Sequence, residues 1–496
     1  MELKKQTFLY YQVVLDATSA PEITADMIVP DMYPDMADVV CATGQACVKE
    51  KSLRDDRLDL TGVARVGVLY RPEGEEGLRK LDVVIPFNHV FDGRFAAQSE
   101  AFCDVRLLEA EAKAVNPRKV SVLCKLSVHA TVYAPTEMEM PTDVSEPCEV
   151  RRKTCTAYMP AAAKSKAFTV NENVEIPASR PPVDEIVISR PNLSVTDVKT
   201  VGNKAVFKGA VNLNILYLSG GEPVSVEHEF SISQIMDIDG LEDGASVDFL
   251  LRFTGCEMGV NNGLGGEHRQ IAVTLHFDAQ AAAYMERSLE AITDLYSTQA
   301  NLNLQMEPVQ LTELNERGVK KQPVRESLEI GEDVRTVIDT NVTLGPITRL
   351  GGDETGCEAY VSMLYADDNG DLKSVSRRLE IPAGIDTEGA KIVNHQAGEV
   401  TAAPASGSME LRFAVDFSFL ATKPFNLLTV AGVVEEEASE KPAHPSVVLR
   451  RCQEKEELWD IAKKYNTTIG ELCLANGLEE SEALPDGRLL LIPKKR

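Results

Sequence analysis

The chain has 496 residues, and its 77 acidic against 51 basic residues give a formal net charge of −26 at pH 7. A charge of that sign disfavours nucleic acid and anionic membrane surfaces as partners, because both are polyanions. The hydrophobic fraction of 44% is ordinary for a globular protein, and no apolar run reaches the roughly 18 residues of a membrane helix. We therefore expect a folded protein that binds no nucleic acid and does not insert into a membrane.

The start of the chain and its cysteines indicate where the protein works. Met1–Gln6 is followed by Thr7–Leu15, which alternates like a strand and lacks the small-residue cleavage site of a secretory signal. The ten cysteines include no CxxC pair and no Cys/His spacing suited to zinc. A disulfide framework or a metal site is the alternative, but reduced thiols that act as small apolar residues are favoured. We expect a cytoplasmic protein with no metal and no cofactor.

A short strand pattern that ends in Leu-Tyr occurs three times, at Val66–Tyr70, Leu213–Tyr217 and Val361–Tyr365. In each copy the first, third and fifth residues are apolar and share one face of the strand. Such period-two alternation, rich in β-branched and aromatic residues, indicates a half-buried strand. A turn follows each copy, and the third turn contains Asn369-Gly370, a strong hairpin signal. We expect this hairpin to be the unit of the fold.

The first two copies belong to longer segments that correspond at a constant offset of 147 residues. The pairs related by this offset are Pro30 and Pro177, Pro34 and Pro181, Val39 and Ile186, and Tyr70 and Tyr217. An offset that stays constant over more than half a unit indicates an internal duplication. The third copy diverges, because Tyr365 lies 148 residues after Tyr217 and the proline pair is missing.

Further strand-like runs follow each hairpin, and they are punctuated by glycine and proline. This pattern predicts a mainly β protein built from three tandem β-sandwich-like repeats. Residues 284–296 carry apolar side chains at helix-like spacing, which leaves a short helix and a strand extension both open. We place the repeats at residues 1–150, 151–310 and 311–432, and an acidic, proline-containing linker at 433–446.

The pattern becomes helical in the last segment, residues 447–496. An apolar helix face is formed by residues spaced i, i+3, i+4 and i+7, namely Leu458, Ile461, Ala462 and Tyr465. Thr468–Glu471 has the spacing of a capping box at the start of a second helix, and Asn476-Gly477 suits its end. With a short strand on either side, the segment is predicted to form a small βααβ domain.

This segment resembles a LysM domain. The match rests on five stretches, Leu458–Ala462, Tyr465–Thr468, Glu471-Leu472, Ala475-Asn476 and Gly487–Pro493. The resemblance implies binding without catalysis, and the usual LysM ligand is an N-acetylglucosamine glycan such as peptidoglycan or chitin. Members that bind glycan usually carry Gly-Asp-Thr just before the first helix. Here that place is Lys455-Glu456-Glu457, which favours a protein ligand and leaves glycan binding as the alternative.

Three β repeats followed by one LysM segment resemble the SipL-like family of SPOCS-domain proteins from spore-forming Firmicutes. The residues that carry this resemblance are the proline-framed segments, the Leu-Tyr hairpins and Leu295–Ser297. The resemblance implies a non-enzymatic scaffold of spore-coat assembly, located in the mother cell at the forespore surface. It also implies that the LysM segment docks on a coat morphogenetic ATPase of the SpoIVA type and that the β repeats bind other coat proteins.

Five residues of the last segment are predicted to bind the protein partner. Trp459 and Tyr465 would supply apolar anchors, and Lys455, Lys463 and Lys494 would supply basic charge around them. Trp459 lies beside the inward stripe of its helix, so an exposed anchor and a core residue are both open. No convergent set of nucleophile, base or metal ligands stands out, so we expect no enzymatic activity.

Overall fold

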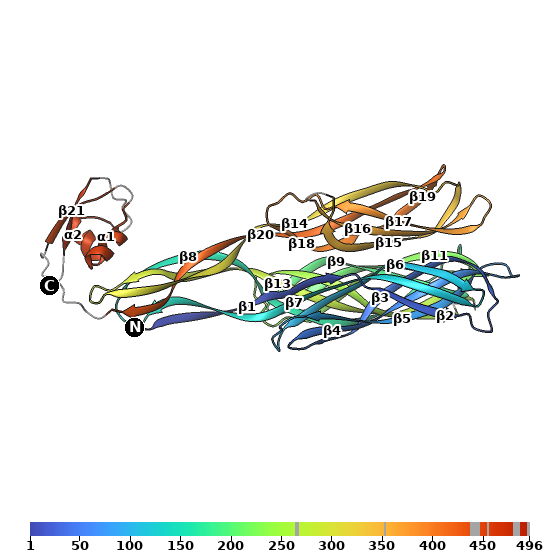
Figure 1. Cartoon of the computed structure of the whole chain (residues 1–496), viewed down its shortest axis with the longest axis horizontal. Coiled ribbons are helices and arrows are strands. Elements are labelled where there is room, and N and C mark those ends of the chain that lie inside the picture. Colours follow the sequence, from blue (N-terminus) through green and yellow to red (C-terminus); the bar gives the residue numbers. More distant parts are fainter. Residues whose placement is uncertain (263–266, 352–353, 437–446, 454–455, 480–486, 494–496) are drawn as a thin grey trace.

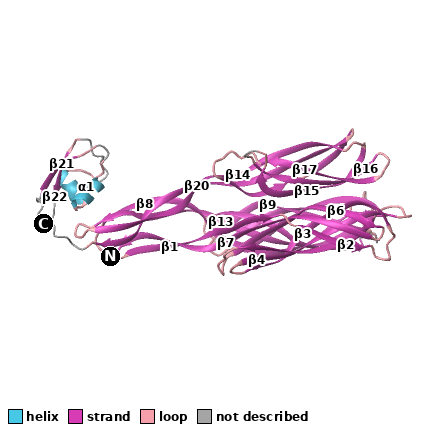
Figure 2. Cartoon of the chain, viewed as in Figure 1, coloured by secondary structure: helices cyan, strands magenta, loops and turns pink. Residues whose placement is uncertain are grey.

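The computed structural model describes residues 1–262, 267–351, 354–436, 447–453, 456–479 and 487–493. Strands make up nearly all of this part of the chain, and the helices are two short ones near the C-terminus (Figure 2). The prediction of a mainly β fold is therefore confirmed. No helix in these ranges is long and apolar enough to cross a membrane.

The strands form three consecutive groups, which we call repeats 1 to 3. Repeat 1 comprises β1 (Leu3–Ser19), β2 (Glu22–Ile28), β3 (Met36–Leu53), β4 (Arg57–Pro72), β5 (Arg79–Asp92), β6 (Glu100–Asn116) and β7 (Lys119–Val144). Repeat 2 comprises β8 (Glu149–Glu175), β9 (Glu185–Val201), β10 (Lys204–Ser219), β11 (Glu222–Asp237), β12 (Ser246–Asn262) and β13 (His268–Tyr296). Repeat 3 comprises β14 (Leu302–Glu329), β15 (Val334–Arg349), β16 (Thr355–Asp367), β17 (Leu372–Pro382), β18 (Ala390–Ala397), β19 (Thr401–Ala405) and β20 (Ser408–Glu435).

Each repeat contains two antiparallel sheets with the same connectivity. One sheet is a three-stranded meander, formed by β3–β5, β9–β11 or β15–β17. In the other sheet the last strand of the repeat (β7, β13 or β20) is central. It pairs on one side with the first strand (β1, β8 or β14) and on the other with the strand that follows the meander (β6, β12 or β18). The two sheets of a repeat enclose an apolar core, so each repeat is the expected sandwich.

The boundaries between repeats differ in part from those predicted. β14 begins at Leu302, so repeat 3 starts before the expected residue 311. β20 continues to Glu435, so residues 433–435 belong to a strand and not to the linker, and residues 437–446 lie outside the described ranges. Residues 284–296, for which helix and strand were both open, form the last part of β13, because they pair along their length with β8.

The tyrosine of each Leu-Tyr pattern faces the core of its own repeat and fixes the loop before the meander. The Tyr70 hydroxyl donates to the carbonyl of Pro34 at 3.3 Å, and the Tyr217 hydroxyl donates to that of Pro181 at 2.9 Å. Repeat 3 lacks the proline pair, and there the Tyr365 hydroxyl donates to the Glu332 carboxylate at 2.8 Å. The proline and tyrosine positions that correspond in the sequence therefore make corresponding contacts.

The leucine of the same pattern faces outward from its repeat and joins the three repeats. Leu69, Leu216 and Leu364 are all buried and pack in one apolar cluster. The packing is cyclic, because the outer face of each meander lies against the next repeat. Lys80 of repeat 1 contacts Ile186 of repeat 2, and Arg190 of repeat 2 contacts Asp339 of repeat 3. Repeat 3 returns to repeat 1 through a hydrogen bond from the Ser374 hydroxyl to the Val40 carbonyl at 2.7 Å. The repeats thus surround a common axis, much as three subunits do in a cyclic trimer.

A polar contact on this axis also draws on all three repeats. Arg190 of repeat 2 donates to the Thr43 hydroxyl of repeat 1 at 3.0 Å and forms a hydrogen-bonded ion pair with Asp339 of repeat 3. The side chains of Arg190 and Asp339 are only 10% and 6% exposed. We call this group the axial triad.

Beyond the sandwiches the long strands continue as three two-stranded ribbons, β1·β7, β8·β13 and β14·β20 (Figure 1). We call this bundle of ribbons the stalk. Apolar side chains from all three ribbons form its core, among them Met140, Met159, Leu289, Leu311 and Leu427. The N-terminus and the described part of the C-terminal module (residues 447–453, 456–479 and 487–493) lie at the far end of the stalk (Figure 1).

Candidate partner-binding site on the C-terminal module

The C-terminal module has the predicted βααβ order. It consists of β21 (Val447–Arg451), α1 (Leu458–Tyr465), α2 (Ile469–Asn476) and β22 (Leu489–Pro493), and β21 pairs antiparallel with β22. The Thr468 hydroxyl accepts from the N–H of Glu471 at 3.1 Å, as the capping-box spacing predicts. Gly477 ends α2 in the left-handed conformation, with φ of 61°.

Trp459 lies between the module and the stalk. The indole is only 7% exposed, and its ring meets that of Tyr296 edge to face, with 5.1 Å between the centroids. Its N–H donates to the Asp294 carboxylate at 2.7 Å. Leu458, Ile461 and Ala462 occupy the inward face of α1, so Trp459 projects from the side of that face toward β13. Of the two possibilities left open for Trp459, the structure shows a buried indole, which is covered by another part of the same chain. Its role in binding a partner stays a prediction.

Two further contacts join α1 and the following loop to the same strand end. The Lys463 ammonium lies 2.5 Å from the second oxygen of the Asp294 carboxylate. The Tyr296 hydroxyl donates to the carbonyl of Thr467 at 2.8 Å. Burial, reinforced by the nearby carboxylates of Glu149 and Asp294, raises the pKa of the Tyr296 phenol well above its usual value, so the hydroxyl keeps its proton and its role as donor.

Of the other predicted site residues, the structure describes Tyr465 and Lys463, and both already have contacts within the chain. The Tyr465 ring lies 5.5 Å from the guanidinium of Arg450, which is itself ion-paired with Glu456. Lys463 is engaged by the stalk, as described above. Lys455 and Lys494 lie outside the described residues, and their role stays a prediction.

The segment that precedes α1 is held by its own charges. The Glu456 carboxylate accepts from the backbone N–H of Gln453 at 2.9 Å and from Arg450. Glu457 occupies the N-cap position of α1, but its side chain pairs instead with Arg151 of β8 at 2.6 Å. The carboxylates that stand where glycan binders usually have Gly-Asp-Thr are therefore both committed within the chain.

Two family models match the chain. Residues 182–258 match the model described as SipL, SPOCS domain, and residues 453–493 match the LysM domain. The chain contains a SPOCS domain and a LysM domain. The SPOCS match covers β9, β10, β11 and most of β12, all within repeat 2. The resemblance drawn from the sequence is confirmed by both matches, whereas no curated protein and no solved structure matches the chain.

Sequence reasoning did not find the stalk residues that hold the LysM domain. Asp294 and Tyr296 lie more than 150 positions before the residues of the LysM domain that they contact, so no local pattern links them. The stretch Leu295–Ser297 stood out only as a family motif. Alternation along β13, with Leu295 buried in the stalk, is the one signal that would have put Asp294 and Tyr296 together on the opposite face.

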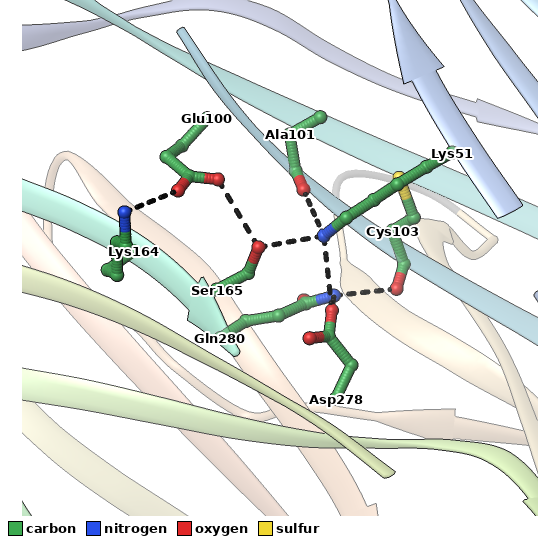
Figure 3. A network of polar contacts seen from close by, with 8 residues as sticks. All are labelled: Lys51, Glu100, Ala101, Cys103, Lys164, Ser165, Asp278 and Gln280. Carbon is green, nitrogen blue, oxygen red and sulfur yellow. Dashed lines mark hydrogen bonds and ion pairs between the residues drawn. The ribbon is translucent and has the colours of Figure 1, made fainter. Parts of the chain in front are cut away.

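One polar network elsewhere has the spacing of a catalytic pair (Figure 3). The Lys51 ammonium donates to the Ser165 hydroxyl at 2.8 Å, a distance suited to a base beside a nucleophile. The same nitrogen donates to the Ala101 carbonyl at 2.9 Å and forms an ion pair with Asp278 at 3.2 Å. The Lys51 nitrogen therefore has three partners, and Ser165 is only one of them.

This network instead connects repeats. Lys51 and Ala101 belong to repeat 1, whereas Ser165 and Asp278 belong to repeat 2, so the contacts fix one repeat against the other (Figure 3). No group of three or more potential metal ligands occurs in the described ranges. The absence of enzymatic activity stays a prediction.

Proposed function

We propose that the chain is a non-enzymatic scaffold of spore-coat assembly that binds a coat morphogenetic ATPase of the SpoIVA type through its LysM domain. The combination of a SPOCS domain and a LysM domain in one chain supports a role in sporulation. The observation that carries the choice of a protein ligand is the segment before α1, where Glu456 and Glu457 form ion pairs within the chain. A sugar would have to displace these charged contacts, whereas a protein can offer replacements for them.

The β repeats would bind other coat proteins, and repeat 1 offers a rigid surface feature of that kind. Met32, between Pro30 and Pro34, is 85% exposed. Its loop is nevertheless fixed, because the Arg118 guanidinium donates to the carbonyls of Val29 at 3.0 Å and Tyr33 at 2.9 Å. An exposed apolar side chain on a fixed loop is a common element of protein-binding surfaces. The scaffold would act in the mother cell, at the forespore surface.

Binding of peptidoglycan or another glycan is the second candidate, and the LysM match itself favours it. The two candidates differ in the ligand of the LysM domain, so a direct comparison separates them. The full chain would be titrated calorimetrically with a SpoIVA-type ATPase and, separately, with chito-oligosaccharide and soluble peptidoglycan fragments. Binding of the ATPase more tightly than of either glycan supports the proposal, and tighter binding of a glycan supports the second candidate.

Substitution of Trp459 tests whether the ATPase uses α1. Trp459→Ala should weaken ATPase binding by about 2 kcal/mol or more, because aromatic anchors dominate protein interfaces. Lys464→Ala, an exposed position on the same helix, is the matched control and should leave binding unchanged. Circular dichroism of both variants would verify the fold before binding is compared.

A further inference from the structure

The face of the LysM domain that carries Trp459 is already occupied by a strand end of the same chain. We propose that this face is a binding site for an extended segment with a carboxylate and an aromatic residue two positions apart. Asp294-Leu295-Tyr296 fills the site within the chain, and a protein partner presents the same pair of groups to compete for it. The proposal rests on the proposed function in one respect, that the LysM domain binds a protein.

The contacts of Asp294 define a carboxylate site. One carboxylate oxygen accepts from the Trp459 indole N–H at 2.7 Å, and the other lies 2.5 Å from the Lys463 ammonium. Trp459 and Lys463 are four residues apart on α1 and so lie on the same side of the helix. One neutral and one charged donor aimed at two oxygens form a site for a single carboxylate, in which charge-assisted hydrogen bonds are strong.

The contacts of Tyr296 define an aromatic site beside it. Successive side chains of a strand point to opposite faces, so Asp294 and Tyr296 both reach the LysM domain while Leu295 is buried in the stalk. The Tyr296 ring packs on the edge of Trp459, and its hydroxyl donates to the Thr467 carbonyl at 2.8 Å. Recognition therefore requires only two side chains on one face of a strand.

Comparison of repeats 1 and 2 shows that the stalk itself does not need this aromatic residue. Along the last strands of the two repeats, corresponding residues lie 151 positions apart. Arg118, just before β7, corresponds in this way to Arg269 of β13, and their guanidinium groups hold the proline loops. Tyr133 and Tyr284 are another such pair, and their hydroxyls meet at 3.3 Å. The same offset pairs Asp143 with Asp294 and Ser145 with Tyr296.

In repeat 1 the end of the strand is closed by ion pairs and by hydrogen bonds of a serine. Asp143 pairs with Lys4 at 3.1 Å and with Arg152 at 3.4 Å, both on the surface of the stalk. The Ser145 hydroxyl accepts from the backbone N–H of Glu2 at 3.0 Å. A serine is thus sufficient at this position of a stalk ribbon. The tyrosine of repeat 2 is explained by its contact with the LysM domain.

The contact is also small enough to be exchanged. The LysM domain has its own fully buried core, with Ile461, Leu472, Leu490 and Ile492 inside it. Release from the stalk would expose mainly Trp459 and Tyr296 and would break the pairs Lys463–Asp294 and Arg151–Glu457. Partly exposed ion pairs such as these contribute little binding energy and are screened by salt. A competing ligand can therefore displace Asp294 and Tyr296 from the LysM domain.

Trp459 is the only tryptophan, so its fluorescence reports directly on this contact. In the full chain, Asp294→Ala should shift the emission to longer wavelength and make the indole at least twofold more accessible to acrylamide. Glu290→Ala is the matched control, because Glu290 lies on the same strand and pairs with Arg152 at 3.1 Å. Lys463→Ala, which removes the same ion pair from the other side, should reproduce the effect of Asp294→Ala. Unchanged emission in both variants would overturn the proposal.

Competition is tested with the double variant Asp294→Ala, Tyr296→Ser, which places the serine of repeat 1 at the strand end. A synthetic peptide of the sequence of residues 289–298 should shift its emission back to shorter wavelength. The same peptide with alanine in place of the aspartate and serine in place of the tyrosine should have no effect. Equal responses to both peptides would contradict recognition of the carboxylate and aromatic pair.

The partner is tested by titrating the SpoIVA-type ATPase into the native chain and into the double variant. Loss of the internal competitor should tighten binding at least tenfold. Equal affinity for the two chains would mean that the ATPase uses another surface, which overturns the competition but leaves the proposed function intact. Failure of the ATPase to bind either chain would instead contradict the proposed function, while the peptide titration would still decide whether the site exists.

Discussion

The axial triad provides a direct test of the cyclic arrangement of the repeats. Asp339→Ala would leave the buried guanidinium of Arg190 without its carboxylate, and breaking a buried ion pair in this way costs about 3–5 kcal/mol. Asp339→Asn keeps an acceptor for the same hydrogen bond and should cost less. Replacing both partners by apolar residues, Arg190→Met with Asp339→Leu, should recover most of the loss, since no unpaired charge then remains.

Urea unfolding followed by circular dichroism would measure these differences in the free energy of unfolding. The control is Glu410→Ala, which breaks the exposed pair Glu410–Arg412, with side chains 51% and 60% exposed, and should cost less than about 1 kcal/mol. If Asp339→Ala were no more destabilising than Glu410→Ala, Asp339 would not be buried against repeat 2. The repeats would then not surround a common axis in solution.

Three further predictions concern the same interfaces and cores. A Cβ atom at Gly67 would lie only 3.0 Å from the Val187 carbonyl oxygen of repeat 2, so Gly67→Ala should lower the melting temperature. Gly259→Ala is the control and should leave the melting temperature unchanged, because the space around Gly259 is open. Burial, and then the Arg106 cation, lower the pKa of His395 from 6.5 to about 3, so the unfolded chain takes up a proton there that the folded chain does not. The folded state therefore loses stability relative to the unfolded chain as the pH falls from 6.5 toward 3, and it loses none through this residue above pH 6.5. His395→Gln should make the melting temperature fall less steeply across that range. An unchanged slope would refute the buried neutral imidazole. Burial raises the pKa of Cys124 to about 11 and that of Cys357 to about 12, so both thiols should react slowly. Brief iodoacetamide treatment followed by mass spectrometry should find the half-buried Cys148 and Cys155 modified first. Early modification of Cys124 would contradict its burial.

The repeats could be found from the sequence because the residues that build them are local or recur at fixed spacing. Alternation in Val66–Tyr70 marked a strand with one buried face, and the constant offset linked the tyrosines to their proline loops. The helices of the LysM domain were equally visible, since Thr468 and Gly477 mark the start and the end of α2 by well-understood local chemistry.

Features that depend on contacts between distant segments could not be found in this way. The leucine before each tyrosine looked like an ordinary outward residue, and only the packing of Leu69 against Leu216 and Leu364 shows that it lies on the common axis. The position of Trp459 on its helix left two possibilities open. Its burial is decided by Asp294 and Tyr296, which belong to another domain.

The location of the chain in sporulating cells tests most directly whether it is a coat scaffold. A fluorescent fusion of the full chain, expressed in a spore-forming host, should appear only in the mother cell and should surround the forespore. A fusion of residues 1–436, which lacks the LysM domain but keeps all three repeats, should remain diffuse in the mother cell. A full-length fusion that stays diffuse during sporulation, or that lines the wall of growing cells, would contradict the proposed role.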